Sequence, residues 1–273
     1  FVGHKDGMSD IHKKNIVSIG DPKKRFSEDP VRCLRAIRFS NKLNFKIDGK
    51  IKDAIYEKGH LLSSISNARL FDEFCKIFLN GMAEKNFKKL TSFGLNKYLV
   101  STNPEKNEFT SRVIIEALRN TDKRLINSQS VTPGFLVAAL LWPELLEKSL
   151  TKGEINLRKF FRSMDQVLKK QQRITAIPRK FHSYIKDIWV LQLKLHSRIG
   201  KQPYKTLKHP RFRAAYDFML IREKASSEIK GLGKWWTDFQ RNDDNLKKSL
   251  INNLKEKDTQ ESFKTFGFSQ ELR

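Results

Sequence analysis

The sequence is poor in cysteine and contains no long apolar run. Cys33 and Cys75 are the only cysteines among its 273 residues, and they lie far apart. This spacing excludes a disulfide framework and a CxxC metal site, and it predicts a cytoplasmic protein, because stable disulfides belong to oxidising compartments. No apolar stretch reaches the roughly 18 residues that a membrane span needs. The opening FVGHKDGMSD also lacks the charged and apolar parts of a signal peptide.

The histidines argue against a metal-dependent phosphohydrolase of the HD type. They are His4, His12, His60, His182, His196 and His209. None is followed directly by Asp, and no two have the spacing of metal ligands on one helix. We therefore expect no metal site built on these histidines.

Positive charge is what the sequence has in excess. It contains 54 Lys and Arg against 30 Asp and Glu, a formal net charge of +24. The segment 241–273 holds seven basic and six acidic residues, so the excess lies in residues 1–240. Such a body attracts polyanions, and its binding should weaken steeply with salt. The alternative is a lysine-coated surface without a specific partner.

Apolar residues recur at three- and four-residue spacing along most of the chain, which predicts an all-α fold. Helices are expected over 30–43, 49–58, 67–80, 83–93, 108–120, 131–149, 154–172, 179–198, 210–225 and 227–240, with Gly and Pro between many of them. A short strand is expected at 16–20, followed by a turn at DPKK. The polar segment 241–273 is interpreted as a loosely held tail.

One of these helices carries a stripe of arginines. Asp29 before Pro30 predicts a helix start with a capping carboxylate. Arg32, Arg35 and Arg38 follow at three-residue steps, and at about 100° per residue they share one side of the helix. The rest of the helix is apolar, so these arginines are expected to line a cleft rather than form a solvated basic face.

Asp29 and Arg32 together have the chemistry to read a base. A carboxylate accepts a hydrogen bond from an exocyclic amino group, and an arginine donates one to a ring nitrogen. The pair could therefore read adenine or cytosine, and it would reject guanine and uracil. The residues alone do not choose between the two accepted bases.

The segment EDPVRCLRAIRF, 28–39, resembles the nucleotide-reading motif of the class II nucleotidyltransferases, which include bacterial poly(A) polymerases and CCA-adding enzymes. The resemblance implies that Asp29 and Arg32 form a protein template for the base of ATP. It implies that Glu28 orients the arginine. Arg35 would support the template or reach the nucleotide, and Arg38 belongs to the same nucleotide-binding set.

A second motif, NARLFDEFCK at 67–76, resembles the RxxxExxK helix of this family. It implies that Arg69, Glu73 and Lys76 support the neck domain. Arg69 and Glu73 are four apart and are expected to pair on one helix face; direct ligand contact is the alternative. Upstream, 7–11 and 16–20 resemble the stretch that joins head and neck, although Asp6 and Ser18 depart from its pattern.

The C-terminal half favours a poly(A) polymerase over a CCA-adding enzyme. The segments 187–193, 208–218 and 234–240 resemble stretches typical of bacterial poly(A) polymerases. Their aromatic residues are interpreted first as core and only second as base-stacking groups; they include Tyr216, Trp235, Trp236 and Phe239.

Two basic stretches could follow an RNA backbone. The favoured one contains Lys201, Lys205, Lys208, Arg211 and Arg213. The other contains Arg158, Lys159, Arg162, Lys169, Lys170 and Arg173. Each could also be an ordinary solvated surface.

The resemblance further implies the neck and body domains of a class II nucleotidyltransferase, with a short β remnant of the head. It divides the chain into a head remnant at 1–20, a neck at 21–100, a helical body at 101–240 and a tail at 241–273. Expected partners are ATP, an RNA 3′ end and RNA-decay proteins. The family's GGxVRD turn and aspartate pair, which hold Mg²⁺ in the head, are absent from this sequence. We therefore expect the chain to be inactive alone, with a CCA-adding enzyme or a non-catalytic RNA-binding remnant as alternatives.

Overall fold

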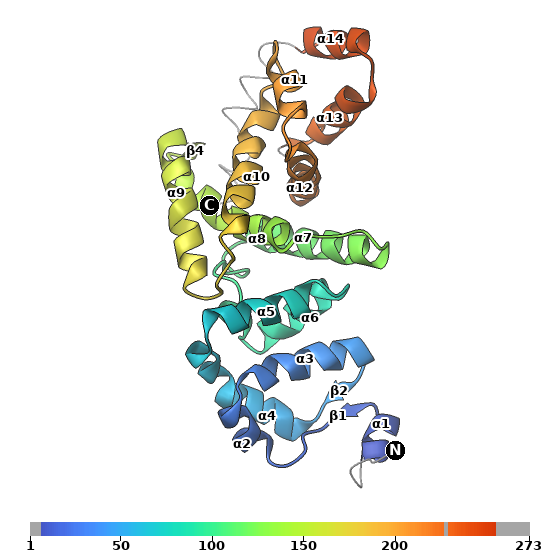
Figure 1. The fold of residues 1–273 in the computed structure, drawn as a ribbon, viewed down its shortest axis with the longest axis vertical. Coiled ribbons are helices and arrows are strands. Elements are labelled where there is room, and N and C mark those ends of the chain that lie inside the picture. Colours follow the sequence, from blue (N-terminus) through green and yellow to red (C-terminus); the bar gives the residue numbers. More distant parts are fainter. Residues whose placement is uncertain (1–6, 227–228, 255–273) are drawn as a thin grey trace. The chain divides into compact units, whose positions relative to one another are not determined.

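The computed structural model describes residues 7–226 and 229–254, and most of them are helical (Figure 1). The predicted all-α fold class is confirmed. The α-helices are α1 (Gly7–His12), α2 (Pro22–Glu28), α3 (Val31–Leu43), α4 (Gly49–Lys58), α5 (Asn67–Phe78), α6 (Ala83–Ser92), α7 (Glu108–Ile126), α8 (Pro133–Ser149), α9 (Leu157–Gln172), α10 (Lys180–His196), α11 (Gln202–Leu207), α12 (Phe212–Ala225), α13 (Leu232–Arg241) and α14 (Asp244–Asn252). Short 3₁₀ helices η1 and η2 cover Gly59–Ser64 and Asn96–Tyr98.

The chain forms two compact units. Unit 1 takes the residues up to Ser101 together with Thr121–Ser130 and Gln171–Ile177. Unit 2 takes Thr102–Asn120, Val131–Lys170 and the residues from Pro178 onward. Two segments that come later in the sequence thus belong to the first unit. The predicted domains, which follow one another in sequence order, do not include this arrangement.

In unit 1, helix α2 begins where the sequence suggested a turn. Asp21 caps α2, because its carboxylate accepts from the backbone N–H groups of Lys23 and Lys24, each at 3.2 Å. Pro22 occupies the first turn, where its missing N–H costs nothing. The interpretation of DPKK as a turn was therefore wrong: this segment is a capped helix start.

The expected strand is shorter than 16–20. β1 (Asn15–Ile16) pairs in parallel with β2 (Lys46–Ile47). The ladder stops there because Asp48 directly after β2 caps α4, accepting from the N–H of Lys50 at 2.9 Å. A second two-stranded ladder, β3 (Leu150–Thr151) with β4 (Glu154–Ile155), is antiparallel and occupies the start of the helix predicted at 154–172.

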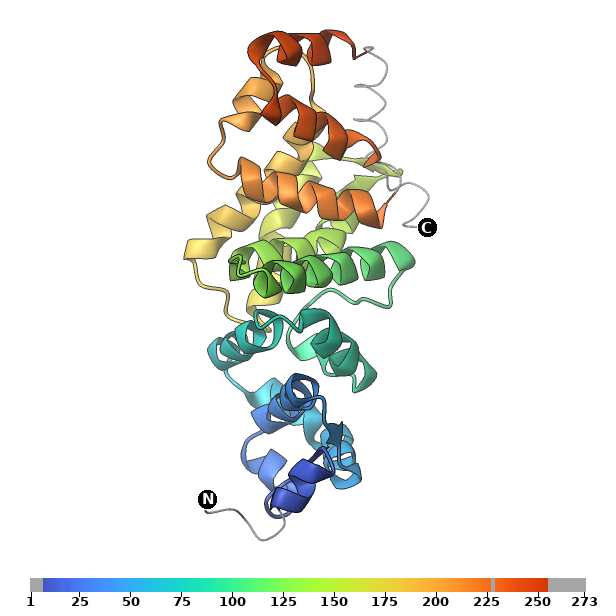
Figure 2. The ribbon, with the colours of Figure 1, turned by 90° about the vertical axis from the view of Figure 1, so that its right-hand side faces the viewer.

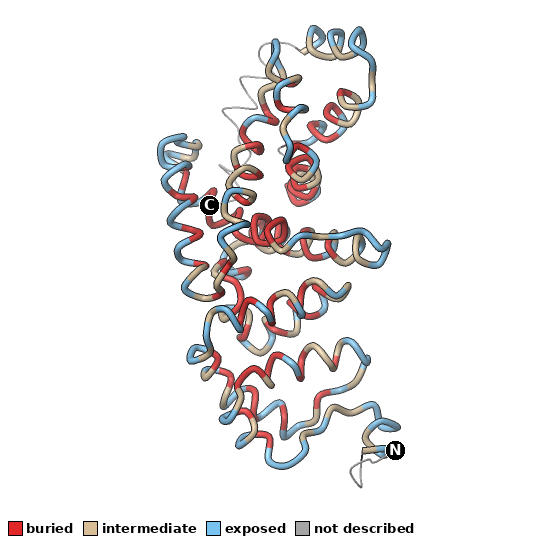
Figure 3. The backbone as a smooth tube through the Cα atoms, in the orientation of Figure 1, coloured by how far each residue is buried: buried red, intermediate tan, exposed pale blue. Residues whose placement is uncertain are grey.

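Phenylalanine rings hold α5 and α6 together in unit 1. Phe74 and Phe78 meet edge to face at 5.0 Å between ring centroids, and Phe87 of α6 lies 6.2 Å from Phe78. Asn86, also buried, donates to the carbonyl of Ile77 at 2.7 Å. In Figure 3 the inward sides of these helices are red, the colour of buried residues.

Unit 2 is built around α8, which is buried over most of its length. Helix α10 packs against α8, and Gly134 allows a close approach, since a Cβ there would lie 3.0 Å from the rings of Phe181 and Tyr184. The indole N–H of Trp189 donates to the carbonyl of Ala138 at 2.9 Å, which joins the two helices at a second point.

A buried arginine joins α12 to its neighbours. The Nη1 of Arg222 donates to Oε1 of Gln192 on α10 at 2.9 Å, and its guanidinium lies 4.6 Å from the ring centroid of Trp142 on α8. The side-chain amide of Gln192 in turn donates to the carbonyl of Ala215 at 3.0 Å. A charge this deeply buried is tolerated because it has both a polar partner and an aromatic face.

Helices α12 and α13 lie side by side in both views (Figure 2). They enclose an aromatic cluster in which Trp235 stacks on Phe239 at 4.8 Å, and Trp236 donates to the carbonyl of Leu195 at 2.8 Å. The prediction that these aromatic residues form core first is confirmed, including Tyr216, which is 5% exposed.

The described part of the segment 241–273 departs from the expected loose tail. Asp243 caps α14 by accepting from the N–H of Leu246 at 2.9 Å. Leu250, Ile251 and Leu254 pack against the aromatic cluster. Polar composition concealed this helix, because only these few apolar residues face the cluster. Residues 255–273, including Phe263, Phe266 and Phe268, lie outside the described residues.

His196 makes the stability of unit 2 dependent on pH. Burial, with the charges of Arg222 and Arg198, lowers the pKa of His196 well below its usual range. The unfolded chain takes up this proton below about pH 6.5, whereas the folded state does not. We expect the free energy of unfolding to fall as pH drops through 6, by up to about 1.4 kcal/mol per pH unit.

Urea unfolding followed by tryptophan fluorescence between pH 7.5 and 5.5 measures this effect, because Trp142, Trp189, Trp235 and Trp236 all lie in unit 2. His196→Leu should flatten the pH dependence, and His182→Gln should leave it unchanged. An equal pH dependence in wild type and His196→Leu would contradict the assignment.

Candidate nucleotide-binding site

Asp29 lies at the junction of α2 and α3, but it does not cap α3 with its side chain. The backbone carbonyl of Asp29 accepts from the N–H of Arg32 at 3.0 Å, and α3 has no side-chain cap. Asp29 itself ends α2 in an extended conformation, with φ −144° and ψ 90°. The predicted capping role of the carboxylate was therefore wrong, and both of its oxygens are directed to other partners.

Those partners are two arginines. The Nη2 of Arg69 on α5 donates to Oδ1 of Asp29 at 2.8 Å, and Nε of Arg32 lies 3.9 Å from Oδ2. The pair expected within α5, Arg69 with Glu73, was wrong, because Arg69 reaches across to the first motif instead. Two motifs that are 40 residues apart in sequence thus meet at one carboxylate.

Glu73 has a different role from the one its spacing suggested. It is 4% exposed, and its Oε1 accepts from Nζ of Lys76 one turn further along α5, at 2.8 Å. Burial of a carboxylate requires such compensation. Glu73 and Lys76 form a local ion pair inside unit 1, while Arg69 lies on the outer side of the same helix.

Glu28 does not contact Arg32. Its Oε2 pairs with Nη1 of Arg25, one turn earlier in α2, at 3.4 Å. The structure thus shows no contact by which Glu28 orients Arg32, and that role stays a prediction. The cause of the missing contact is geometric, because Glu28 ends one helix and Arg32 begins the next, so the two side chains leave the junction in different directions.

The arginine stripe on α3 is only partly buried. Arg32 and Arg38 are half-buried, and Arg35 is exposed. The guanidinium of Arg38 lies 4.5 Å from the ring centroid of Phe39, and that of Arg35 lies 6.0 Å from it. The Nε atoms of Arg32 and Arg38 are buried without a hydrogen-bond partner among the described residues.

These contacts define what the site can do chemically. Asp29 offers Oδ2 as an acceptor beside the guanidinium of Arg32, while Oδ1 is held by Arg69. This is a donor and an acceptor side by side, the pattern that matches an amino group next to a ring nitrogen. Sequence reasoning missed two contacts: Arg69 as the partner of Asp29, and Phe39 as the ring near Arg35 and Arg38. The contact between Arg69 and Asp29 has no signal in the local spacing of residues.

A hollow of about 670 Å³ lies elsewhere in unit 1. It is lined by residues 7–20 with gaps, and by Leu43 and Phe45. None of the predicted nucleotide-binding residues lines it. Asp6, which departs from the family pattern next to this region, lies outside the described residues.

The favoured RNA-binding residues lie on α11 and the start of α12. All five are exposed: Lys201, Lys205, Lys208, Arg211 and Arg213. Arg211 lies 4.9 Å from the ring centroid of Tyr184, and Arg213 pairs with Asp217 at 3.1 Å. The second basic stretch forms the exposed side of α9, opposite the buried Phe160 and Val167, and its Lys170 pairs with Glu144 at 2.9 Å.

The described residues contain no group of three or more metal-binding side chains, counting His, Cys, Asp and Glu. Over residues 7–226 and 229–254, no helix has both the length and the apolar character needed to cross a membrane.

The fold resembles a solved structure described as a tRNA-processing enzyme (apo form 2), with a TM-score of 0.58 over 91% of this chain and 67% of that one. At 14% identity this likeness shows the fold alone. A CCA-adding enzyme of Bacillus pumilus is 26% identical over 266 residues, 93% of this chain and 63% of the relative. The fold therefore resembles that of this tRNA-processing enzyme, and the sequence is similar to that of a CCA-adding enzyme.

Two family models match the chain. "Probable RNA and SrmB-binding site of polymerase A" covers residues 44–108, and "Polymerase A arginine-rich C-terminus" covers residues 152–265. Poly(A) polymerase I of Salmonella typhi is 35% identical over 259 residues, and that of Escherichia coli O157:H7 is 36% identical over 261. These matches cover 91% and 92% of this chain, and 56% of each relative. Over more than nine tenths of its length the chain is similar to bacterial poly(A) polymerases, and it spans a little over half the length of these relatives.

Removal of Arg69 tests whether its ion pair stabilises the fold. Both partners contact solvent, with 49% of the Arg69 side chain and 21% of the Asp29 side chain exposed. Exposed pairs typically contribute about 0.2–1 kcal/mol. We expect Arg69→Ala to lower the stability of α3 and α5 by less than about 1 kcal/mol, measured by native-state hydrogen exchange.

Lys88→Ala is the matched control, since it removes a cation paired with Glu84 at 2.7 Å in the same unit. If Arg69→Ala lowers the stability several times more than Lys88→Ala does, the Arg69–Asp29 contact stabilises the fold. A role in ligand binding would then not be needed to explain it.

Proposed function

We propose that this chain forms the base-reading and RNA-binding part of a polynucleotide adenylyltransferase, which adds AMP from ATP to RNA 3′ ends. The observation that carries the proposal is the Asp29 carboxylate, held by Arg69 on one oxygen and facing Arg32 with the other. In this role Asp29 accepts from the adenine amino group, and Arg32 donates to the adjacent ring nitrogen.

Arg69 is proposed as a positioning residue for this template. It fixes the carboxylate by a charge-assisted hydrogen bond, which is short and directional. Arg35 and Arg38 follow on the same helix and are proposed to approach the nucleotide phosphates, because arginine suits phosphate oxygens in both charge and geometry. Glu73 and Lys76 are proposed to support the neck helix from within.

We propose that the Mg²⁺ ions for nucleotide transfer are bound by residues outside the described part of this chain. No metal-binding group is available among the described residues, so no chemical step is assigned to them. The 273-residue polypeptide is accordingly proposed to bind substrates without catalysing transfer by itself. RNA-decay proteins in the cytoplasm are proposed partners. The family-model description for residues 44–108 names RNA and SrmB as what this region of polymerase A binds.

A CCA-adding function is the second candidate. A CCA-adding enzyme of Pediococcus pentosaceus is 41% identical over 93 residues, 34% of this chain. Asp29 and Arg32 could read cytosine as well as adenine, so the two candidates differ in whether CTP is bound alongside ATP.

Nucleotide competition tests the template. We expect wild-type protein to bind ATP more tightly than GTP and UTP. In Asp29→Asn the ratio of ATP affinity to GTP affinity should fall about tenfold, which lies within the roughly 1–3 kcal/mol that one good base contact contributes. Lys88→Ala is the control on the same unit. Equal binding of ATP and GTP by the wild-type chain would contradict base reading, and equal binding of ATP and CTP would favour the CCA-adding candidate.

RNA binding at different salt concentrations tests the α11–α12 surface. Each lysine or arginine that contacts a phosphate contributes about 0.7 to the slope of log K against log salt for a single strand. We expect the triple variant Lys205→Ala, Lys208→Ala, Arg211→Ala to reduce this slope by about 2. The charge-matched control is Lys13→Ala, Lys14→Ala, Lys24→Ala in unit 1; equal losses in both triple variants would show that only net charge matters.

A further inference from the structure

Two neighbouring helices of unit 1 repeat one arrangement of side chains. On α4, Tyr56 follows Lys52 by four residues, and on α6, Phe93 follows Lys89 by four residues at the helix end. Residues four apart lie on the same side of a helix. Each helix therefore presents a lysine and an aromatic ring on one side, and the two sides face each other.

The aromatic rings are in contact. The ring centroids of Tyr56 and Phe93 lie 5.1 Å apart, with 47° between the ring planes. Tyr56 is nevertheless 65% exposed, the largest exposure of any tyrosine among the described residues. Phe93 supports the tyrosine ring from one side, while much of its remaining surface faces solvent.

The two lysines also lie near each other. Burial and the charge of Lys52 lower the pKa of Lys89. The Nζ of Lys89 donates to Oγ of Ser40 at 2.8 Å, and neither Lys52 nor Lys89 forms a salt bridge within the described residues. Lys52 is exposed and Lys89 is half-buried, and neither charge has an acidic partner among the described residues.

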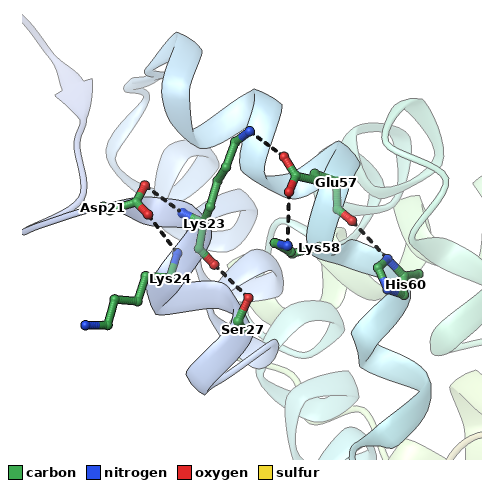
Figure 4. A network of polar contacts seen from close by, with 7 residues as sticks. All are labelled: Asp21, Lys23, Lys24, Ser27, Glu57, Lys58 and His60. Carbon is green, nitrogen blue, oxygen red and sulfur yellow. Dashed lines mark hydrogen bonds and ion pairs between the residues drawn. The ribbon is translucent and has the colours of Figure 1, made fainter.

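The carboxylate next to Tyr56 in sequence is already engaged. Glu57 pairs with Lys23 of α2 and, at 3.0 Å, with Lys58, and its backbone carbonyl contacts Nδ1 of His60 at 2.9 Å (Figure 4). Its charge is therefore balanced within this network. The patch made of Lys52, Tyr56, Lys89 and Phe93, here called the Tyr56 patch, keeps its positive character.

We propose that the Tyr56 patch binds one nucleotide of single-stranded RNA, with the base stacked on Tyr56 and a phosphate between Lys52 and Lys89. An exposed ring beside unpaired cations is the combination that single-stranded nucleic acid requires, because every base has a π face and every linkage a charge. A duplex keeps its bases stacked on one another and cannot use the ring.

This site lies in unit 1 and shares no residue with the α11–α12 surface of unit 2. It rests on the proposed function only in taking RNA as the polymer bound. The patch falls within residues 44–108, so the RNA part of the matched family description is consistent with it. A protein occupant would use the ring as an apolar contact and would leave RNA binding independent of Tyr56.

Fluorescence anisotropy with a labelled 12-nucleotide oligoadenylate and a 12-base-pair RNA duplex tests the proposal. We expect Tyr56→Ala to weaken single-strand binding about tenfold, as loss of one base stack does, and to change duplex binding by less than about twofold. Tyr56→Phe should restore single-strand affinity, since it keeps the ring. Lys52→Ala should lower the salt slope by about 0.7, the contribution of one phosphate contact.

Lys50→Ala is the matched control, because it removes an exposed lysine from another side of α4. Unchanged single-strand binding in Tyr56→Ala, equal losses for single strand and duplex, or equal effects of Lys50→Ala and Lys52→Ala would each overturn the proposal.

The α11–α12 triple variant separates this inference from the proposed RNA surface. If the triple variant weakens RNA binding and Tyr56→Ala does not, the Tyr56 patch fails while the proposed surface stands. If Tyr56→Ala weakens binding and the triple variant does not, the patch stands and the surface fails. If neither variant matters, both assignments are wrong.

Discussion

The packing of α3, α5 and α6 in unit 1 is the constraint on which the candidate nucleotide site depends. The rings of Phe74, Phe78 and Phe87 lock α5 to α6, and α3 packs on both helices. This core brings the N-terminal turns of α3 and α5 together, so that Arg69 reaches Asp29 at 2.8 Å. An exposed ion pair adds little stability by itself. The apolar core therefore determines its geometry, and the pair in turn orients the carboxylate that is proposed to read the base.

The distribution of compensated and uncompensated charge follows a consistent pattern. The buried carboxylate of Glu73 is balanced locally by Lys76, and the exposed carboxylate of Glu57 is balanced by Lys23 and Lys58. Other cations, such as Lys201, Lys205 and Lys208, are exposed, so part of the excess positive charge faces solvent. A polyanion is the natural ligand for such surfaces, because binding releases its condensed counterions. Aromatic rings beside these cations, Tyr184 near Arg211 and Tyr56 near Lys52, add the possibility of discriminating single strands from duplexes.

Much of the fold could be predicted from the sequence, because apolar spacing, Gly and Pro act locally. The helices expected at 49–58 and 30–43 agree with α4 and α3 to within a residue. The α-helices that were missed, α1, α2, α11 and α14, are short, and α2 and α14 begin at capping aspartates. Candidate residues such as Asp29 and Arg32 were found because the motif that contains them is contiguous. Their partners were misassigned where the contact crosses elements, as for Arg69 with Asp29.

The sequence by itself determined the all-α class, the resemblance to bacterial poly(A) polymerases, the basic character of the chain and the proximity of Asp29 and Arg32. These features reside in residue type and short-range spacing, which do not need a folded chain to be visible. Only the tertiary structure decided that Arg69 holds Asp29, that the buried Glu73 pairs with Lys76, and that the ring of Tyr56 meets that of Phe93. The physical reason is that several side chains in the sequence are long enough to reach any one charged group or ring. The packing of helices that are distant in sequence decides which of them makes the contact.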